Sequence, residues 1–450
     1  MRQKDEQIGE TFPIRSDRRQ MSTKLIWIAE RAKADRKLRF NNLAHLITPE
    51  FLIETWKQMN QKGTGGVDGE SMKAYGAELE IQVKQLCEQL RANRYIAPPV
   101  RRVYIPKSGK DGKRPLGIPT VEDRLLQRAV ARLLEAVYEQ DFLDCSYGFR
   151  PKRNPHQALQ AVWKAVVTTG VNYVYEADIL GFFNHLNHEW LRKMIAHRIA
   201  DPVILQLIGK WLKAGVMENG VVMRMADGSP QGGSISPILS NVYLHYVLDL
   251  WFEKVFKKQC QGEAYLVRFA DDFVSCFEYR QDAENCHRSV ETRLRKFGLE
   301  LAAEKTRIMQ FGRVAREKEH RYGVKPETFE FLGFKHVCGT DRKGRFALVR
   351  IPSTKSCRKF LDKTYEWLKR HYHWKLADQQ KGLSDRLRGF YQYFGLHHCK
   401  PKLFWIRKQV YHQWIRRLRR RSQRHRCSWS YLYSQSCFKL PYFNHPLQSV

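Results

Sequence analysis

Acidic side chains are scarce in this sequence. Its 450 residues include 46 Asp and Glu against 79 Lys and Arg, which gives a formal net charge of +33. Asp385 is the last acidic residue, and everything after it is neutral or basic. A charge imbalance of this size concerns binding partners rather than fold. It indicates a polyanionic partner, with a lipid surface as the competing interpretation.

Long apolar runs are missing as well. No uninterrupted apolar stretch reaches the length of about 18 residues that a membrane-spanning helix needs. The chain starts with the charged segment MRQKDEQ, and no apolar core follows it. We therefore expect no signal peptide, no membrane span and a cytoplasmic location.

Paired cysteines are also absent. The ten cysteines are scattered along the chain and none forms a CxxC pair, which argues against a zinc site. Without an export signal, we expect reduced thiols with structural roles. No internal repeat or low-complexity tract is visible, so the length predicts two or three ordinary domains.

What the middle of the chain does contain is an alternation of strand and helix patterns. The expected strands are residues 172–178, 264–270, 273–278 and 307–311, with helices from Ser236 and over residues 282–297. This β-α-β-β-α-β order predicts a split βαβ sheet of the α+β class. The first and third strands are central neighbours in such a sheet, so Asp178 would lie near the hairpin turn at Asp271 and Asp272.

Other elements are expected on both sides of this sheet. We predict a long amphipathic helix over residues 236–255 and a basic, helical segment after Pro352. Hairpins are expected around SGKDG and around the NG pair in VMENGVVM. Further helices are expected near residues 23–37, from Thr48, and over residues 71–93, 121–140, 189–199 and 202–214.

Two adjacent carboxylates, Asp271 and Asp272, lie inside the apolar stretch VRFADDFVSC. A solvated turn between two strands accounts for such a pair on its own. Asp178 on the neighbouring strand favours a metal site instead. Three carboxylates suit two Mg²⁺ ions, and ions roughly 3.5–4 Å apart can stabilise the attacking and leaving oxygens of a phosphoryl transfer.

Several ordered motifs resemble those of group II intron reverse transcriptases/maturases. The central ones are YEADILGFFNHLNHEW, GSPQGGSISPILSNVYLH and VRFADDFV. The flanking segments RRVYIPKSGKDGKRPLGIP, CSYGFRPKRNPHQAL, FGLELAAEKTRI, FEFLGF and LRGFYQYFG also match. The resemblance spans about residues 39–429.

This resemblance implies a right-hand polymerase with fingers, a palm built on the split sheet and a helical thumb. Residues 1–40 would be a basic N-terminal arm, 41–170 the fingers, 171–350 the palm and 351–450 the basic thumb, also called the maturase or X domain. The reverse transcriptase domain would span about residues 41–350.

The resemblance also implies roles for residues of the palm. Asp178 and Asp271 would bind both metal ions, Asp272 would assist, and the backbone carbonyl of Ile179 would complete one coordination shell. The ions would be Mg²⁺, with Mn²⁺ as a substitute. Phe183 would be the steric gate that excludes a ribose 2′-hydroxyl, or else a plain core aromatic.

Four further residues would contact the incoming dNTP. Lys107 and Arg114, in the fingers hairpin, would clamp the triphosphate, although surface charge on a turn is the simpler interpretation. Gln231, in SPQGG, would lie beside the nucleotide. The two glycines that follow it would allow the backbone to approach the template–primer closely. The simpler interpretation of this segment is an ordinary turn before a helix. Lys305 would lie near the phosphates.

The basic tail points to nucleic acid. A solvated helix normally alternates charge sign, but no acid offsets the arginines of HQWIRRLRRRSQRHR. Trp405, Trp414 and Trp429 are interleaved as apolar anchors. The expected phosphate contacts are Arg416, Arg417, Arg419, Arg420 and Arg421.

Some positions depart from the family. Asn184 stands where Asp is common, Leu180 where a polar residue is usual, and Phe269 where Tyr is the commoner residue. We expect reduced or altered activity at most from Asn184. Few residues follow Trp429, and none forms a CxxC pair, so the expected form lacks the C-terminal DNA-binding region and nuclease.

The sequence thus predicts an RNA-directed DNA polymerase that copies RNA by two-metal nucleotidyl transfer and assists group II intron splicing and mobility. Expected partners are the intron RNA, an RNA template–DNA primer duplex and target DNA, without a membrane. One alternative is a maturase that binds RNA and lacks polymerase activity. Another is a domesticated reverse transcriptase in defence or repair.

Overall fold

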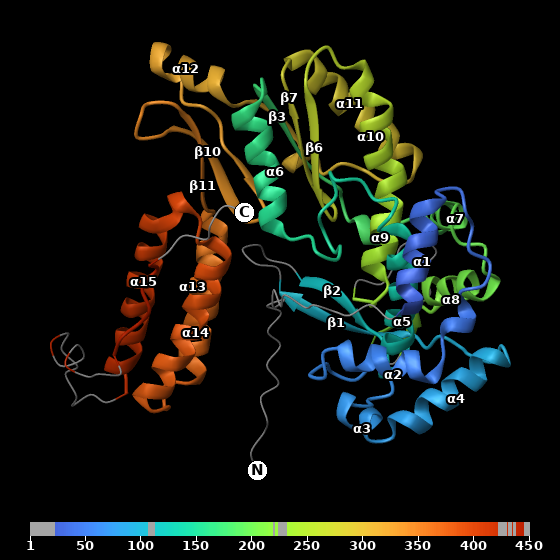
Figure 1. Cartoon of the computed structure of the whole chain (residues 1–450). Helices are drawn as coiled ribbons and strands as arrows, with labels where there is room; N and C mark the ends of the chain where they lie inside the picture. The colour runs from blue at the N-terminus through green and yellow to red at the C-terminus, as the bar shows by residue number, and fades with distance from the viewer. Residues whose placement is uncertain are drawn as a thin grey trace.

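The computed structural model describes residues 23–106, 113–218, 221–223, 232–421, 430, 434 and 438–444. Figure 1 shows three helices, α13 to α15, standing on one side of the molecule, and a helical region containing α1 to α5 on the other. The sheet that contains β3, β6 and β7 lies above the hairpin of β1 and β2. This mixed architecture confirms the predicted α+β class.

The N-terminal helices share an apolar cluster with the central sheet. They are α1 (Thr23–Ala34), α2 (Pro49–Gln58), α3 (Met72–Ala77), α4 (Leu79–Arg91) and α5 (Val121–Tyr138). Thr48 caps α2 by accepting a hydrogen bond from the Phe51 backbone amide, as its position before an apolar run predicts. Helix α1 packs on α5 with Leu25 and Ile28 buried, so it is part of the core rather than a separate arm.

The two hairpins predicted from turn residues form a single sheet. They are β1 (Val100–Pro106) with β2 (Lys113–Ile118), and β4 (Val216–Glu218) with β5 (Val221–Met223). The order is β2-β1-β4-β5, because β1 also pairs in parallel with β4. The sequence did not predict that link, which ties the hairpins together.

The central sheet has the predicted split βαβ topology. Its strands are β3 (Tyr173–Asp178), β6 (Ala264–Phe269), β7 (Asp272–Phe277) and β8 (Arg307–Gln310). Their order is β6-β7-β3-β8 with every neighbouring pair antiparallel. Strands β7 and β3 are therefore the central neighbours.

Both faces of this sheet are buried in apolar clusters. Tyr175 and Phe273 face the cluster that also includes α5, α7 (His188–Ala196) and α8 (Pro202–Lys213). Val174 and Val274 face a second cluster, with α6 (Pro155–Thr168) and the C-terminal helices. The alternation follows from the two-residue period of a strand.

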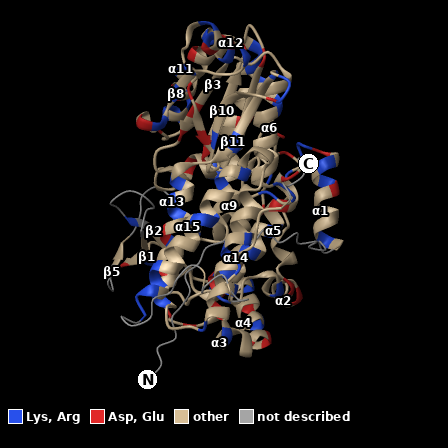
Figure 2. Ribbon diagram, turned by 90° about the vertical axis from the view of Figure 1, so that its left-hand side faces the viewer, with Lys and Arg blue, Asp and Glu red and all other residues tan. Residues whose placement is uncertain are grey.

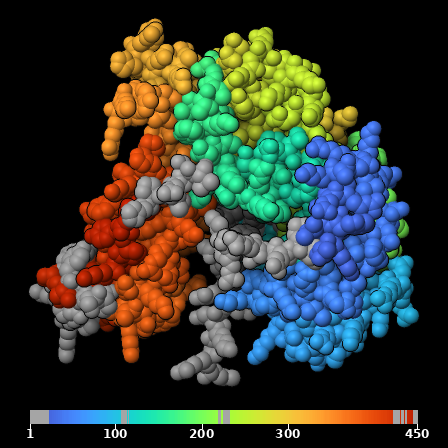
Figure 3. Space-filling model, viewed as in Figure 1, coloured from blue at the N-terminus to red at the C-terminus, as the bar shows by residue number. Residues whose placement is uncertain are grey.

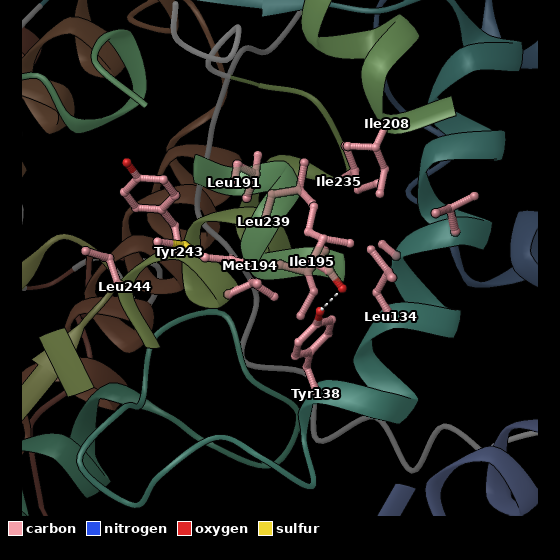
Figure 4. Packing of buried hydrophobic residues seen from close by; sticks show 14 of the residues in the cluster. Leu134, Tyr138, Leu191, Met194, Ile195, Ile208, Ile235, Leu239, Tyr243 and Leu244 are labelled. Atoms are coloured by element: carbon pink, nitrogen blue, oxygen red, sulfur yellow. Dashed lines mark hydrogen bonds between the residues drawn. The ribbon is translucent and has the colours of Figure 1, made fainter. Parts of the chain in front are cut away.

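Figure 4 shows part of the first cluster, where side chains of α5, α7 and α9 interdigitate. The Tyr138 hydroxyl finds a partner there by donating a 3.0 Å hydrogen bond to the Ile195 carbonyl. Helix α6 packs against β6 and β7, although the sequence grouped its residues with the fingers.

The long helix expected over residues 236–255 forms, but it is not amphipathic. It comprises α9 (Ser236–Leu244), a π-helical segment (His245–Asp249) and α10 (Leu250–Lys254). The prediction of one polar face is wrong, because seven consecutive residues of α9, from Ile238 to Leu244, are buried. Helix α11 (Arg280–Lys296) follows the sheet hairpin as predicted.

A small antiparallel sheet joins the central sheet to the C-terminal helices. It contains β9 (Phe329–Phe331), β10 (Phe334–Thr340) and β11 (Phe346–Pro352), and it follows α12 (Arg313–Tyr322). The sequence pattern did not predict it. The three helices expected to form the thumb are α13 (Thr354–Arg370), α14 (Leu376–Phe394) and α15 (Lys400–Arg419).

Candidate active site

The carboxylates meet at one end of the central sheet. Asp178 is the last residue of β3 and Asp272 the first of β7, and the two are direct cross-strand partners. Phe269 of β6 pairs with Asp272 across the hairpin, so Asp271 lies in a two-residue turn with Ala270. The convergence that the sequence predicted is therefore present in the backbone register.

The electrostatics of this site reflect crowded negative charge. Burial, together with the neighbouring charges of Asp178 and Asp271, raises the pKa of the Asp272 carboxyl to about 8. The Lys305 ammonium forms an ion pair with the Asp178 carboxylate. Its hydrogen bond with Asp178 raises the pKa of Lys305.

The donors that converge at this end of the sheet are carboxylate oxygens. Across the described residues, no three His, Cys, Asp or Glu side chains are already arranged as a metal site. The oxygens that converge here are nevertheless the hard donors that Mg²⁺ prefers. Burial and the neighbouring carboxylates raise the pKa of Asp272, and the Lys305 ammonium offsets part of this negative charge in this structure. The donor types would therefore suit a divalent cation at this position.

Ile179 and Phe183 follow Asp178 on a short connection. Hydrogen bonds from Ala302 to the Asp178 carbonyl and from Leu180 to the Glu300 carbonyl flank the bridge between Ile179 and Leu301. The carbonyl of Ile179 takes part in neither bond. Phe183 is half-buried and its ring lies edge-on to Phe182 at 5.3 Å, so its core role and its proposed gating role are compatible.

The residues expected to bind the triphosphate are described only in part. Lys107 and Gln231 lie outside the described residues, as does Trp429 of the basic tail. The Arg114 backbone belongs to β2, opposite Ile105. Lys305 forms an ion pair with Asp178, which places its ammonium within the carboxylate site.

The two glycines after Gln231 lie where the fold leaves little room for a side chain. Gly232 has a φ of 118°, and a side-chain carbon there would lie 2.3 Å from the Gly117 carbonyl of β2. The close approach that the sequence assigned to a template–primer is thus made here by the protein's own hairpin. A side-chain carbon at Gly233 would similarly crowd Gln127 and Ser236.

The basic end of α15 is largely exposed, and Figure 2 shows Lys and Arg on the thumb helices α13 and α15. Arg416, Arg419, Arg420 and Arg421 are exposed, while Arg417 is half-buried with its guanidinium over the Tyr365 ring at 4.3 Å. Trp414 was predicted as an anchor for nucleic acid, and that prediction is wrong. It is fully buried and donates to the Gln379 side chain at 2.7 Å.

The sequence interpretation missed a buried polar network beside the turn. Arg268 of β6 and Asp249 form an ion pair with both side chains fully buried. The available signal was an Arg inside the apolar strand AYLVRFA, because a charge in such a position requires a partner. No sequence pattern identified Asp249 as that partner.

A palm-like split sheet with three carboxylates at one end defines a candidate nucleotidyl transferase. Residues 105–336 match the family model of reverse transcriptase (RNA-dependent DNA polymerase). Since this match covers more than half of the chain, the chain belongs to the reverse transcriptase family. Within the described residues, no helix is long and apolar enough to cross a membrane.

The relatives point to the group II intron branch of that family. Protein YkfC of Escherichia coli is 40% identical over 48% of this chain and 59% of its own length. The group II intron-encoded protein LtrA of Lactococcus lactis is 38% identical over 45% of this chain and 33% of its own length. The chain thus spans less than two thirds of these relatives, and the resemblance to the group II intron family is confirmed.

A solved structure of apo telomerase from Candida tropicalis aligns with 54% of this chain and 55% of its own, at 16% identity and a TM-score of 0.41. At that score the likeness supports no conclusion about fold or function.

Proposed function

We propose that this chain is an RNA-directed DNA polymerase that acts in the splicing and mobility of a group II intron. The observation that carries the proposal is the convergence of Asp178, Asp271 and Asp272 at the end of two paired central strands. Membership of the reverse transcriptase family supports the same activity. Similarity to an intron-encoded protein supports the intron role.

Asp178 and Asp271 would hold two Mg²⁺ ions, with Asp272 and the Ile179 carbonyl assisting, and Mn²⁺ accepts the same oxygen donors. When bound, such ions supply activation of the primer 3′-hydroxyl and neutralisation of charge on the leaving pyrophosphate. The chain itself holds the carboxylates on paired strand ends, which fixes their spacing before substrate arrives.

Lys305 has a further part in this scheme. Its ammonium contacts Asp178, and its side chain is 61% exposed. A dNTP brings a triphosphate that competes for the same ammonium. We therefore assign Lys305 to the phosphates of the bound nucleotide, together with Arg114 and Lys107 of the β1–β2 hairpin and Gln231 next to it.

Two other regions select and hold the substrate in this proposal. Phe183 presents a half-buried ring two residues after Gly181, where a ribose 2′-hydroxyl would meet it. The arginines at the end of α15 supply phosphate contacts to the template–primer and to intron RNA, because they are exposed and lack nearby acids in the sequence. Target DNA is the third polyanion that this surface would bind.

The test is primer extension on an RNA template with Mg²⁺, comparing the wild type with Asp271→Asn. We expect wild-type extension and a loss on the order of 10³-fold in the variant, since several kcal/mol of charge stabilisation are removed. Asp385→Asn, an exposed carboxylate on α14, is the matched control and retains activity. Homopolymer RNA and intron-derived RNA are both used as templates, so that activity confined to one kind of template is still detected.

Binding of group II intron RNA is measured on the same proteins. If the wild type and Asp271→Asn give equal background extension while both bind the RNA and assist splicing, the chain is a maturase without polymerase activity. If extension is strong but intron RNA is bound no better than unrelated RNA, the intron role is wrong.

A further inference from the structure

The guanidinium of Arg268 lies directly behind the turn that carries Asp271. Arg268 is fully buried, and its Nε and Nη2 donate to the two carboxylate oxygens of Asp249 at 2.7 and 2.6 Å. Asp249 is the last residue of the π-helical segment and is also fully buried. A π segment shifts the helix register, and such segments are frequent at functional sites.

The remaining N–H groups of Arg268 are also engaged. Nη2 donates to the Ser146 hydroxyl at 2.7 Å, and Nη1 donates to the Asn241 side chain at 3.1 Å and to the Ala270 carbonyl at 2.9 Å. These bonds, with the two to Asp249, use all five N–H donors of a guanidinium. A lysine with three donors and a different shape cannot reproduce this set.

The bond to Ala270 reaches the turn itself. Ala270 has a φ of 58°, the left-handed region that is uncommon for residues other than glycine, and glycine is the usual residue at the first position of many two-residue hairpin turns. Something other than local preference must hold this conformation. Arg268 does so from one side, because its Nη1 donates a hydrogen bond to the Ala270 carbonyl.

Gly148 closes the turn from the other side. A side-chain carbon at this position would lie 2.3 Å from the Ala270 nitrogen, so the two backbones are in direct contact. The Asn241 amide donates to the Gly148 carbonyl at 2.8 Å while its oxygen accepts from Arg268. Arg268 and Gly148 therefore contact the Ala270 backbone directly, and Asn241 connects the two.

We propose that Arg268 is a positioning residue, which fixes the Ala270 carbonyl and thereby sets the direction in which Asp271 and Asp272 leave the turn. The proposal rests on the proposed polymerase function. It differs from a purely structural ion pair, because the bond to Ala270 connects the buried network to the carboxylates. A small displacement of catalytic groups costs far more in rate than in stability.

The double variant Arg268→Met with Asp249→Leu separates the two roles. Replacing both partners of a buried ion pair by apolar residues is often neutral for folding. Because Ser146, Asn241 and the Ala270 carbonyl also lose their donor, we expect a folded protein with a lower melting temperature, a kcat about 100-fold lower and little change in the KM for dNTP. If the double variant folds and its kcat equals that of the wild type, the positioning role is wrong.

A second variant approaches the turn from Gly148 and needs no change to the ion pair. Gly148→Ala places a methyl group against the Ala270 backbone, and we expect it to lower kcat in a folded protein. Gly209→Ala is the matched control, because nothing lies within 4 Å of the added carbon on α8. Full activity of a folded Gly148→Ala protein would count against the proposal.

Hydrogen exchange of the peptide spanning residues 264–277 supplies a readout that does not depend on polymerase activity. In the double variant we expect faster exchange at the turn and unchanged exchange in α8. A wild type that fails to extend primers overturns the proposed function alone. Unchanged exchange at the turn of a folded double variant overturns the role of Arg268, whichever activity the wild type has.

Discussion

The carboxylate turn between β6 and β7 and the basic end of α15 carry opposite charges and are built in opposite ways. The turn is held by the buried side chain of Arg268, which is paired with Asp249 and donates to the Ala270 carbonyl of the turn. The end of α15 presents exposed arginines on a helix whose other face is buried. Figure 3 shows the thumb helices on the side of the molecule away from the N-terminal helices.

The difference predicts how each region responds to change. At the turn, one substitution should alter several groups together, because they share one network. At the end of α15, each arginine should contribute separately, because exposed charges interact through solvent. The predictions below test this contrast, from the largest expected effect to the smallest.

The single variant Arg268→Met should lower the free energy of unfolding by about 3–5 kcal/mol, because it leaves the buried Asp249 carboxylate without its partner. Urea unfolding followed by circular dichroism measures the change. Arg388→Met, which removes an exposed partner of Asp385 on α14, is the control and should change stability by well under about 1 kcal/mol. If both variants lost the same free energy of unfolding, the buried network around Arg268 would contribute no more to stability than an exposed ion pair.

Asp272→Asn should stabilise the metal-free protein by about 2 kcal/mol at high pH, since it removes the cost of burying a charged carboxylate and the repulsion from Asp178 and Asp271. The folded-state pKa of Asp272, about 8, lies above the ordinary value of 3.8, so the folded protein binds more protons than the unfolded chain between these values. Wild-type stability should therefore fall relative to the variant as pH rises from about 4 to 8, and then level off. Unfolding measured in EDTA at each pH tests this.

Added Mg²⁺ sharpens the same measurement. A cation held by the carboxylates offsets their repulsion, so Mg²⁺ should stabilise the wild type above pH 8 more than it stabilises Asp272→Asn. A stability difference between the two proteins that stays constant with pH would show that the pKa of Asp272 is not raised in the folded protein.

Phe183→Ala should lower the preference for dNTP over rNTP by about 10–100-fold, because an aromatic contact of this kind contributes roughly 1–3 kcal/mol of discrimination. Single-nucleotide extension with each substrate gives the ratio of kcat/KM values. Phe183→Tyr keeps the ring and should keep the preference. Unchanged discrimination by a folded Phe183→Ala protein would assign Phe183 to the core alone, where its ring meets Phe182.

Arg416→Ala and Arg420→Ala should each weaken RNA binding slightly and lower the slope of log K against log salt by about 0.7–0.9. Their double variant should show the sum, because the two exposed side chains act separately. Filter binding at several salt concentrations gives the slopes. Arg388→Ala, whose partner is Asp385, is the charge-matched control, and an equal slope change there would show a general effect of net charge.

Much of the fold was predictable because its signals are local. Thr48 before an apolar run predicts the start of α2, and the NG pair predicts the hairpin of β4 and β5. The strand and helix order around Asp178, Asp271 and Asp272 was enough to predict that their strands are neighbours, since a split βαβ sheet has one strand order, whereas the register came from the structure.

The remainder depends on contacts between distant segments. Trp414 lies among basic residues in the sequence, as an exposed tryptophan that contacts nucleic acid would. Its hydrogen bond to Gln379 of α14 shows that it is a core residue. Gly232 looks like a substrate-facing glycine until β2 is placed beside it. The network of Arg268 joins residues from three segments, and no local pattern specifies which carboxylate it meets.

Strand β6 is the edge of the central sheet, and a segment from far earlier in the chain covers it. The Tyr147 amide donates to the Arg268 carbonyl at 2.9 Å, and the Arg268 amide donates to the Cys145 carbonyl at 2.7 Å. Arg268 and Ser146 are 122 residues apart, so this cover closes only after a long loop has formed. Until then β6 presents unpaired backbone groups, and intermolecular strand pairing during refolding should begin at this edge.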